Sequence, residues 1–133
     1  MNRTGFVCGA FDLLHPGHLY LLRECKNRCG YLVVGLHVNP QINRRHKNKP
    51  VQTIFERFYQ LKNCKYVDQI IPYETEGDLT NILQTQEIDI RFLGTEYLDK
   101  RNKITGKEIV PIEYIRRYHT YSSSGLRERI KKA

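Results

Sequence analysis

Long apolar runs are missing from this sequence of 133 residues. No stretch approaches the roughly 20 consecutive apolar residues that a helix needs to cross a bilayer. Residues 1–4 lead directly into a short strand-like run and lack the apolar segment of a secretory signal peptide. These absences predict a cytoplasmic protein that has no membrane partner.

Cysteine is scarce, and its spacing matches no metal site. The four cysteines, Cys8, Cys25, Cys29 and Cys64, form no Cys-x-x-Cys pair and fit no zinc pattern. Cys25 and Cys29 are four positions apart, on one face of a predicted helix. In a reducing compartment we expect buried thiols rather than a disulfide or a metal site.

Internal repeats, low-complexity tracts and linkers are also absent. The length suits one ordinary domain, and a hydrophobic content of 40% excludes a disordered chain. We therefore expect a single domain over residues 1–133.

Acidic residues are outnumbered by basic ones. The chain has 22 Lys plus Arg against 14 Asp plus Glu, which gives a net charge of +8. Such a chain prefers an anionic partner, whether nucleic acid, a nucleoside triphosphate or an anionic membrane. Charge alone does not choose among them.

Short apolar runs alternate with amphipathic segments along the whole chain. This alternation predicts an α/β fold, a single Rossmann-like doubly wound parallel sheet flanked by helices. Thr53 and Glu56 form a capping box that opens one helix, and Asp78 is expected to cap another. The expected strands are 5–8, 31–37, 69–72, 88–93 and 108–114, and the expected helices are 18–29, 53–63, 78–86 and 122–131.

The loop after the first strand is suited to a polyphosphate. Gly9 lets a ligand approach the main chain closely. The helix beginning near Gly17 presents free N–H groups and a positive dipole end, which favour an anion. His15 and His18 lie three apart across a Pro-Gly turn, so both imidazoles are expected to donate to phosphate oxygens in one crevice. Asp12 is expected to orient a neighbouring base or to help hold a metal-bound phosphate.

A bare His-x-x-His pair is weak evidence on its own. Most such pairs are surface or core histidines, and a pair could also ligate a metal. Zinc usually takes a third or fourth protein ligand, and no residue nearby clearly supplies one. The complete string, placed between a strand and an apolar helix, is what favours a phosphate site.

Residues 9–18 read Gly-Ala-Phe-Asp-Leu-Leu-His-Pro-Gly-His. This string resembles the Gly-x-Phe-Asp-Leu-Leu-His-x-Gly-His signature of the cytidylyltransferase-like nucleotidyltransferase superfamily, most closely the glycerol-3-phosphate cytidylyltransferases. Similarity covers nearly the whole chain. Tyr31-Leu-Val-Val resembles the family's second strand, Lys65-Tyr-Val-Asp68 its Arg-Tyr-Val-Asp element, and residues 117–124 its Arg-Thr-Glu-Gly-Ile-Ser-Thr-Thr signature.

The resemblance implies roles for individual residues. His15 and His18 would contact the nucleotide phosphates and stabilise the transition state, and Arg117 would lie along the nucleotide. The serines that open the last helix would hold the β- and γ-phosphates, although they also suit a plain helix N-cap. The implied nucleotide site is Gly9, Ala10, Phe11, Asp12, Gly17, His18, Arg117, Ser122, Ser123 and Ser124.

Further cationic residues are implied less directly. The basic run 44–49 follows the second strand, where the family places phosphate-binding lysines. Lys49 is favoured over Lys47 as the catalytic lysine of this run. Arg57 and Lys65 are candidates for acceptor or phosphate contacts, and each could equally be an ordinary surface charge.

The implied reaction is a direct in-line displacement with Mg²⁺ bridging the phosphates. An acceptor phosphate attacks the α-phosphorus of CTP, and pyrophosphate leaves. The resemblance also implies a homodimer. An adenylyltransferase that uses ATP is the alternative within the superfamily, and a nucleic-acid-binding module is the alternative outside it. The second alternative leaves the histidine loop unexplained, and the chain has no RNA-recognition consensus or zinc finger.

Three departures from the family pattern leave the acceptor open. Gly94-Thr95-Glu96 replaces Gly-Asp-Asp after the fourth strand, and a longer basic loop follows it. His119 and Thr120 stand where the family has Glu and Gly. The segment 73–78 is acidic and lacks the family's substrate-contacting lysine. Glu74 and Glu76 could suit an acceptor that carries a cationic group, or could equally be solvent-facing charges.

Overall fold

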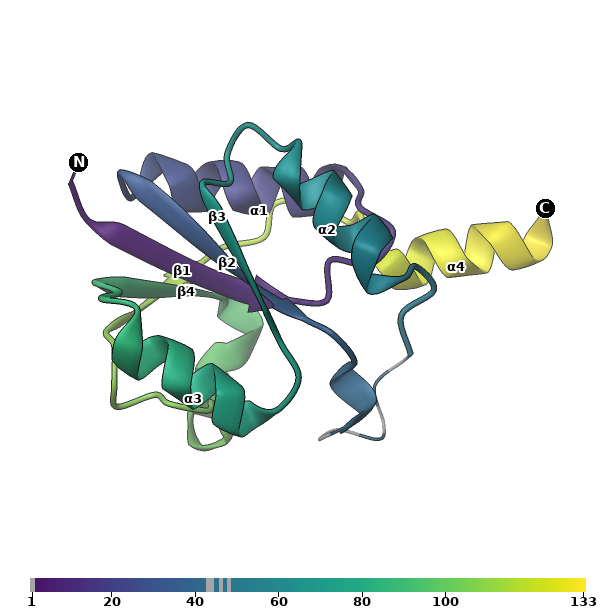
Figure 1. The fold of residues 1–133 in the computed structure, drawn as a ribbon. Helices are drawn as coiled ribbons and strands as arrows, with labels where there is room; N and C mark the ends of the chain where they lie inside the picture. The colour runs from purple at the N-terminus through teal and green to yellow at the C-terminus, as the bar shows by residue number, and fades with distance from the viewer. Residues whose placement is uncertain (1, 43–44, 46, 48) are drawn as a thin grey trace.

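The computed structural model describes residues 2–42, 45, 47 and 49–133. Its centre is a sheet of five parallel strands in the order β3-β2-β1-β4-β5 (Figure 1). The strands are β1 (Thr4–Gly9), β2 (Tyr31–His37), β3 (Gln69–Tyr73), β4 (Ile90–Gly94) and β5 (Ile112–Ile115). The structure confirms the predicted Rossmann-like, doubly wound sheet.

Helices cover both faces of this sheet. α1 and α2 lie on one face, and α3 lies on the other (Figure 1). The helices are α1 (Pro16–Asn27), α2 (Ile54–Lys62), α3 (Glu76–Thr85) and α4 (Ser123–Lys132), with the 3-10 segments η1 (Pro40–Ile42) and η2 (Thr95–Lys103). The predicted capping box of α2 is present, because the Thr53 side chain accepts from the Glu56 N–H and the Glu56 carboxylate accepts from the Thr53 N–H.

Each face of the sheet has its own apolar core. One core packs α1 and α2 against the sheet through buried residues that include Leu22, Cys25 and Leu61. The other packs α3 through Leu79 and Leu83, together with other residues, against the opposite face. All four cysteines are free thiols and Cys25 and Cys29 are buried, as the sequence predicts.

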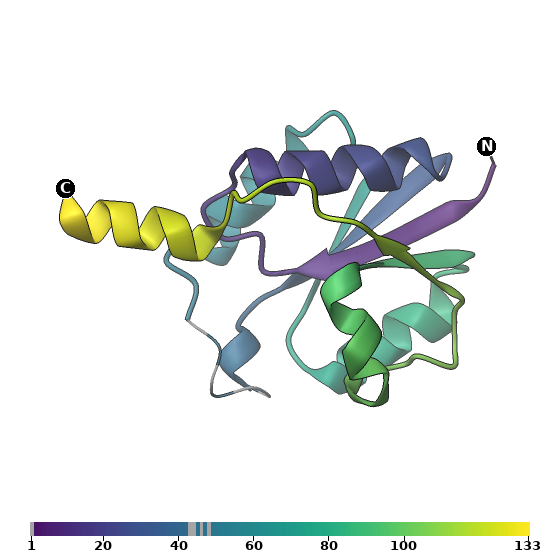
Figure 2. The same cartoon turned by 180° about the vertical axis from the view of Figure 1, so that it is seen from behind.

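The last helix projects beyond the carboxyl ends of the strands (Figures 1 and 2). None of its residues is buried. The strand order reverses direction between β1 and β4, and such a switch point is where ligands bind in doubly wound sheets. None of the described helices has the length and apolar character to cross a membrane.

Several predicted boundaries differ by one or two residues, as at α1 and β4, and two differ for a clear physical reason. Helix α3 begins at Glu76 with Thr75 as its N-cap, because Asp78 is the third helical residue and completes a capping box with Thr75. The strand predicted over 108–114 is shorter, since the main chain turns at Gly106 (φ 71°) and Ile109 N–H donates to the Gly106 carbonyl. The loop predicted before it contains η2.

Candidate functional site

A cavity of about 780 Å³ lies beside the end of β4, at the carboxyl edge of the sheet. The N-terminus of α1, the end of β4 and the segment between β5 and α4 form its walls. The residues that line it include His15, Gly17, His18, Tyr20, Gly94, Glu96, Arg117, His119, Tyr121, Ser122 and Ser123. The structure thus brings together both predicted histidines, the predicted arginine and two of the three predicted serines.

The two histidines form an unusual capping box at the start of α1. His15 is the N-cap, and its Nδ1 accepts from the Gly17 N–H at 3.0 Å. The Nδ1 of His18 accepts from the His15 N–H at 3.2 Å, and the two rings stack with centroids 3.9 Å apart. Because both Nδ1 atoms are acceptors, each neutral ring carries its proton on Nε2. Both Nε2–H groups are therefore donors for a ligand.

Burial keeps both rings uncharged. Burial and then the neighbouring His15 lower the pKa of His18 to about 3, although the Asp12 carboxylate acts in the opposite direction. Burial, His119 and Arg117 lower the pKa of His15. At neutral pH the pair offers two neutral hydrogen-bond donors, and Arg117 supplies the positive charge nearby.

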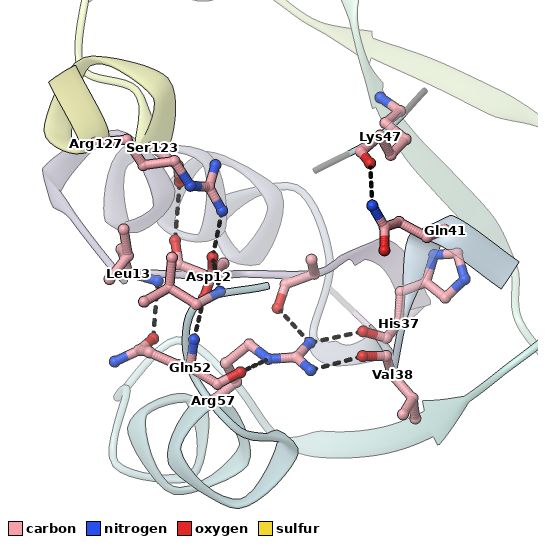
Figure 3. Close-up of polar contacts among 12 residues, drawn as sticks. Asp12, Leu13, His37, Val38, Gln41, Lys47, Gln52, Arg57, Ser123 and Arg127 are labelled. Atoms are coloured by element: carbon pink, nitrogen blue, oxygen red, sulfur yellow. Dashed lines mark hydrogen bonds and ion pairs between the residues drawn. The ribbon is translucent and has the colours of Figure 1, made fainter. Parts of the chain in front are cut away.

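The loop between β1 and α1 has a strained main chain. Phe11 and Leu13 have positive φ angles of 49° and 53°, which cost of order 1–3 kcal/mol each for residues other than glycine. The Phe11 ring lies 5.4 Å from the His18 ring, so this conformation supports the histidine pair. The Leu13 N–H is held by Gln52 Oε1 at 2.8 Å (Figure 3).

Asp12 holds three segments together (Figure 3). Its buried carboxylate accepts from the Val51 N–H at 2.8 Å and the Gln52 N–H at 2.9 Å, and forms an ion pair with Arg127 of α4 at 2.6 Å. These bonds occupy the carboxylate that the sequence suggested for orienting a base or a metal-bound phosphate. Asp12 therefore positions the loop between β1 and α1 against α4, and its part in nucleotide binding stays a prediction.

Arg57 is a second internal brace (Figure 3). It is 2% exposed and donates to the main-chain carbonyls of Gln52, Ala10, His37 and Val38. Its donors thus hold the ends of β1 and β2 instead of facing an acceptor at the surface. The predicted phosphate contact is replaced by a structural one.

The serines at the start of α4 have distinct positions. Ser122 is the N-cap and accepts from the Gly125 N–H at 2.9 Å. Ser123 Oγ donates to the Asp12 carbonyl at 2.8 Å, and both residues line the cavity. Ser124 is exposed and is not among the lining residues.

Gly17 leaves room for two rings. A Cβ at this position would lie 2.6 Å from His119 Cε1 and 2.7 Å from His15 Cε1. The rings of His119, Tyr20 and Tyr121 form a triangle: His119 stacks on Tyr20 with centroids 5.7 Å apart and is tilted against Tyr121 at 5.6 Å, and the two tyrosine rings are 6.4 Å apart. Arg117 donates to the Tyr121 carbonyl, which curves the segment around this aromatic wall. Sequence reasoning noted His119 only as a departure from the family pattern.

The remaining predicted cations lie further from the histidines. Lys49 is exposed and is not among the residues lining this cavity or its neighbour, whereas Lys47 lines the neighbouring one. The Lys47 carbonyl accepts from Gln41 Nε2 at 3.0 Å (Figure 3). The other predicted members of this run, Arg44, His46 and Asn48, lie outside the described residues. Lys65 is exposed beside Tyr66, at a separate surface depression.

A second cavity of about 400 Å³ adjoins the first. The two share His18, Leu21, Gly94, Glu96 and Ser123 as lining residues. The second one also contains Gly9, Ala10, Phe11 and Asp12, and it extends towards α3 and η2. A group held at His18 can therefore be approached from two sides.

The described residues contain no cluster of three or more His, Cys, Asp or Glu side chains that could hold a metal ion. Mg²⁺ keeps several waters and phosphate oxygens and needs only one or two carboxylates. Glu96 is a carboxylate that lines both cavities. The single carboxylate of Glu96 fits a Mg²⁺ ion that is bound mainly by triphosphate oxygens and water.

Three contributors to this site were missed in the sequence. Arg127 is four positions after Ser123 and so shares its helix face, a spacing that could have revealed the ion pair with Asp12. Arg91 interrupts the buried run of β4, and a charge in such a run is a signal. Glu96 gave no local signal beyond its departure from the family pattern.

Comparison with known proteins gives a consistent picture. The cytidylyltransferase-like family model matches residues 6–129. The bifunctional protein HldE of Helicobacter pylori (strain HPAG1) is 32% identical over 129 residues, which are 96% of this chain and 27% of HldE. The ethanolamine-phosphate cytidylyltransferase of Arabidopsis thaliana is 32% identical over 116 residues, 83% of this chain and 27% of that protein. The chain thus spans about a quarter of the length of these relatives.

Solved structures share the fold. The lipopolysaccharide core biosynthesis protein from Thermoplasma volcanium GSS1 superposes with a TM-score of 0.66 at 25% identity, covering 90% of this chain and 98% of the other. Pantothenate synthetase from Thermus thermophilus superposes with a TM-score of 0.60 at 18% identity, covering 99% of this chain and 65% of the other.

Proposed function

We propose that this chain, which belongs to the cytidylyltransferase-like family, transfers CMP from CTP to a small phosphorylated acceptor, glycerol 3-phosphate or a similar molecule. Membership of the family establishes the nucleotidyltransferase superfamily. The observation that best supports the proposal is the stacked pair of neutral imidazoles, whose Nε2–H groups are left as donors and which line the first cavity.

The reaction is a single displacement at phosphorus. An oxygen of the acceptor phosphate forms a bond to the α-phosphorus, and the bond from the α-phosphorus to the oxygen bridging to the β-phosphorus breaks. Pyrophosphate leaves with that oxygen and its electron pair, so no covalent enzyme intermediate is needed. Catalysis rests on positioning and on stabilising charge, as in other phosphoryl-type transfers.

The described residues supply these two contributions. His15 and His18 donate to the oxygens on which charge develops, and Arg117 balances charge along the triphosphate. Ser122 and Ser123 place the positive N-terminus of α4 at the phosphates. Mg²⁺, when bound to the triphosphate, supplies further neutralisation, and Glu96 is the residue we assign to hold it. The second cavity, which meets the first at His18, is where the acceptor would lie.

CTP is proposed over ATP. The spacing between Arg117 and the serines is that of the cytidylyltransferase signature, and one relative carries the name ethanolamine-phosphate cytidylyltransferase. Discrimination would come from hydrogen bonds to the base edge, where an unpaired buried group costs about 1–3 kcal/mol. We therefore expect roughly 10- to 100-fold preference in kcat/KM.

A pyrophosphate-release assay tests the proposal. CTP and ATP are each incubated with a panel of phosphorylated acceptors, including glycerol 3-phosphate and ethanolamine phosphate. Release that requires both an acceptor and CTP supports it. A higher kcat/KM with ATP than with CTP would make ATP the proposed nucleotide. No pyrophosphate release with any pair of nucleotide and acceptor would contradict the transferase activity.

A further inference from the structure

Strand β4 carries a buried arginine in the middle of its apolar run. Arg91 is 4% exposed and lies between Ile90 and Phe92, which are also buried. Arg91 is among the residues that line the second cavity. A charged group at such a position needs a physical reason, because arginine is almost never fully buried unless it is paired.

The contacts of Arg91 are few. One Nη1–H donates to the Thr105 carbonyl, and Nη2 lies 3.9 Å from Cys8 Sγ, a weak acceptor. Nε is buried and has no hydrogen-bond partner. Within the described part of the chain, no carboxylate forms an ion pair with it, although Glu76 and Glu96 line the same cavity.

Arg57 shows what a structural arginine looks like in this protein. It is equally buried but donates to four main-chain carbonyls. Arg91 has one such carbonyl. Removing a charge from water costs several kcal/mol, and a single neutral acceptor returns only part of that cost. The guanidinium is therefore short of a counter-charge.

The second cavity is suited to supply that counter-charge as a ligand. It meets the nucleotide cavity at His18, and Lys47 and Lys103 also line it. Guanidinium groups bind phosphate through two parallel N–H···O bonds. In Arg91, Nε has no partner and Nη2 has only the weak thiol acceptor of Cys8.

We propose that Arg91 receives the phosphate of the acceptor in the second cavity. This inference rests on the proposed function, because it takes the acceptor to be phosphorylated. Arg91 would thus determine specificity. An acceptor without an anionic group could not supply the counter-charge that the buried guanidinium lacks, and would bind more weakly.

Inorganic phosphate is the probe for this site. The protein is first saturated with α,β-methylene-CTP, which fills the nucleotide cavity and cannot release pyrophosphate. Phosphate is then titrated by calorimetry. We expect wild-type protein to bind phosphate, and Arg91→Met to bind it about 10- to 100-fold more weakly, the effect of losing hydrogen bonds to a charged group. The affinity for the nucleotide analogue should stay within about twofold of wild type, well below one such hydrogen bond.

Two further variants sharpen the test. Arg91→Lys keeps the buried charge but loses the fork of donors, and it should also weaken phosphate binding. Lys62→Met removes one positive charge from the exposed end of α2 and should leave phosphate binding unchanged. Circular dichroism checks that each variant folds.

The outcomes separate this inference from the proposed function. Equal phosphate affinity in a folded Arg91 variant overturns the inference, as does wild-type protein that binds the analogue but no phosphate. If neither Arg91 variant folds, Arg91 is a structural brace and the inference fails. Wild-type protein that does not bind the analogue contradicts the proposed function itself.

Discussion

His15 and His18 each have two roles: one ring nitrogen makes a structural hydrogen bond, and the other is a donor for a ligand. Nδ1 accepts a main-chain N–H at the start of α1, which fixes the ring, and Nε2–H is thereby left as the donor. A protonated imidazole could not accept at Nδ1. Protonation of either ring would therefore break the cap as well as add charge in a buried place.

This arrangement predicts loss of stability in acid. The pKa of His18 is about 3 in the folded state and 6.5 when exposed, so the unfolded chain binds more protons between those values. The stability contributed by the neutral ring is present above pH 6.5 and is lost as the pH falls towards 3, by up to about 1.4 kcal/mol per pH unit. Urea unfolding of wild type and His18→Asn at about pH 7 and about pH 5, which lie on either side of the ordinary histidine pKa, measures it. Asparagine can accept the capping bond and does not titrate, so an equal loss in both proteins would contradict the assignment.

At the scale of elements, α4 is fixed at its first turns. None of its residues is buried, so its position depends on Ser123 and Arg127, which both bind Asp12. Asp12 in turn holds the loop that precedes α2. One carboxylate thus links the start of α4, where we propose that phosphate binds, to the histidine loop.

Arg127→Met should loosen this link. We expect a loss of about 1–3 kcal/mol in stability, because the Asp12 carboxylate keeps only its two main-chain donors. Nucleotide affinity should fall by about tenfold, equivalent to about 1.4 kcal/mol, since Ser122 and Ser123 lose their fixed position. Denaturant unfolding and calorimetry measure the two effects. Lys131→Met, an exposed change on the same helix, should stay within about 0.5 kcal/mol of wild type, and equal effects of both changes would exclude a special role for the Asp12 pair.

The sequence predicted the elements well because their signals are local. Capping at Thr53, the glycine after α1 and the apolar runs of the strands are all readable from neighbouring residues. The histidine motif was readable for the same reason. The partners of Asp12, Arg57 and Arg91 are not, because each partner lies across the fold and depends on strand order and loop path. Residues 108–114 are predicted as a strand, but the turn at Gly106 delays the start of β5 to Ile112.

At the scale of the whole molecule, helix α2 exposes a pair of aromatic side chains. Phe55 and Tyr59 of α2 are 71% and 58% exposed and stack with centroids 6.1 Å apart, and Val51 is exposed beside the same helix. Exposed aromatic residues gathered in this way are common at protein interfaces. We propose this face as the interface of the homodimer that the family resemblance implies.

We predict that the protein sediments as a species of twice its chain mass of 15.8 kDa at micromolar concentration. Phe55→Asp should shift it towards the monomer because a charge would have to be buried at the interface. Sedimentation velocity with circular dichroism as a folding check measures the change. A species near 15.8 kDa alone in the wild type would refute the dimer, and an unshifted dimer in Phe55→Asp would place the interface elsewhere.

We propose that the histidine pair stabilises the reacting α-phosphorus centre through Nε2–H. The most direct measurement is kcat for pyrophosphate release by wild type, His18→Asn and His18→Gln, with the working nucleotide and acceptor. Asparagine reproduces the Nδ1 acceptor and lacks the distal donor, whereas glutamine can place an amide N–H near the position of Nε2. We predict that His18→Asn folds and loses about 10²- to 10³-fold in kcat, as for other lost transition-state donors, and that His18→Gln recovers part of this loss. Near-normal kcat in folded His18→Asn would contradict the account.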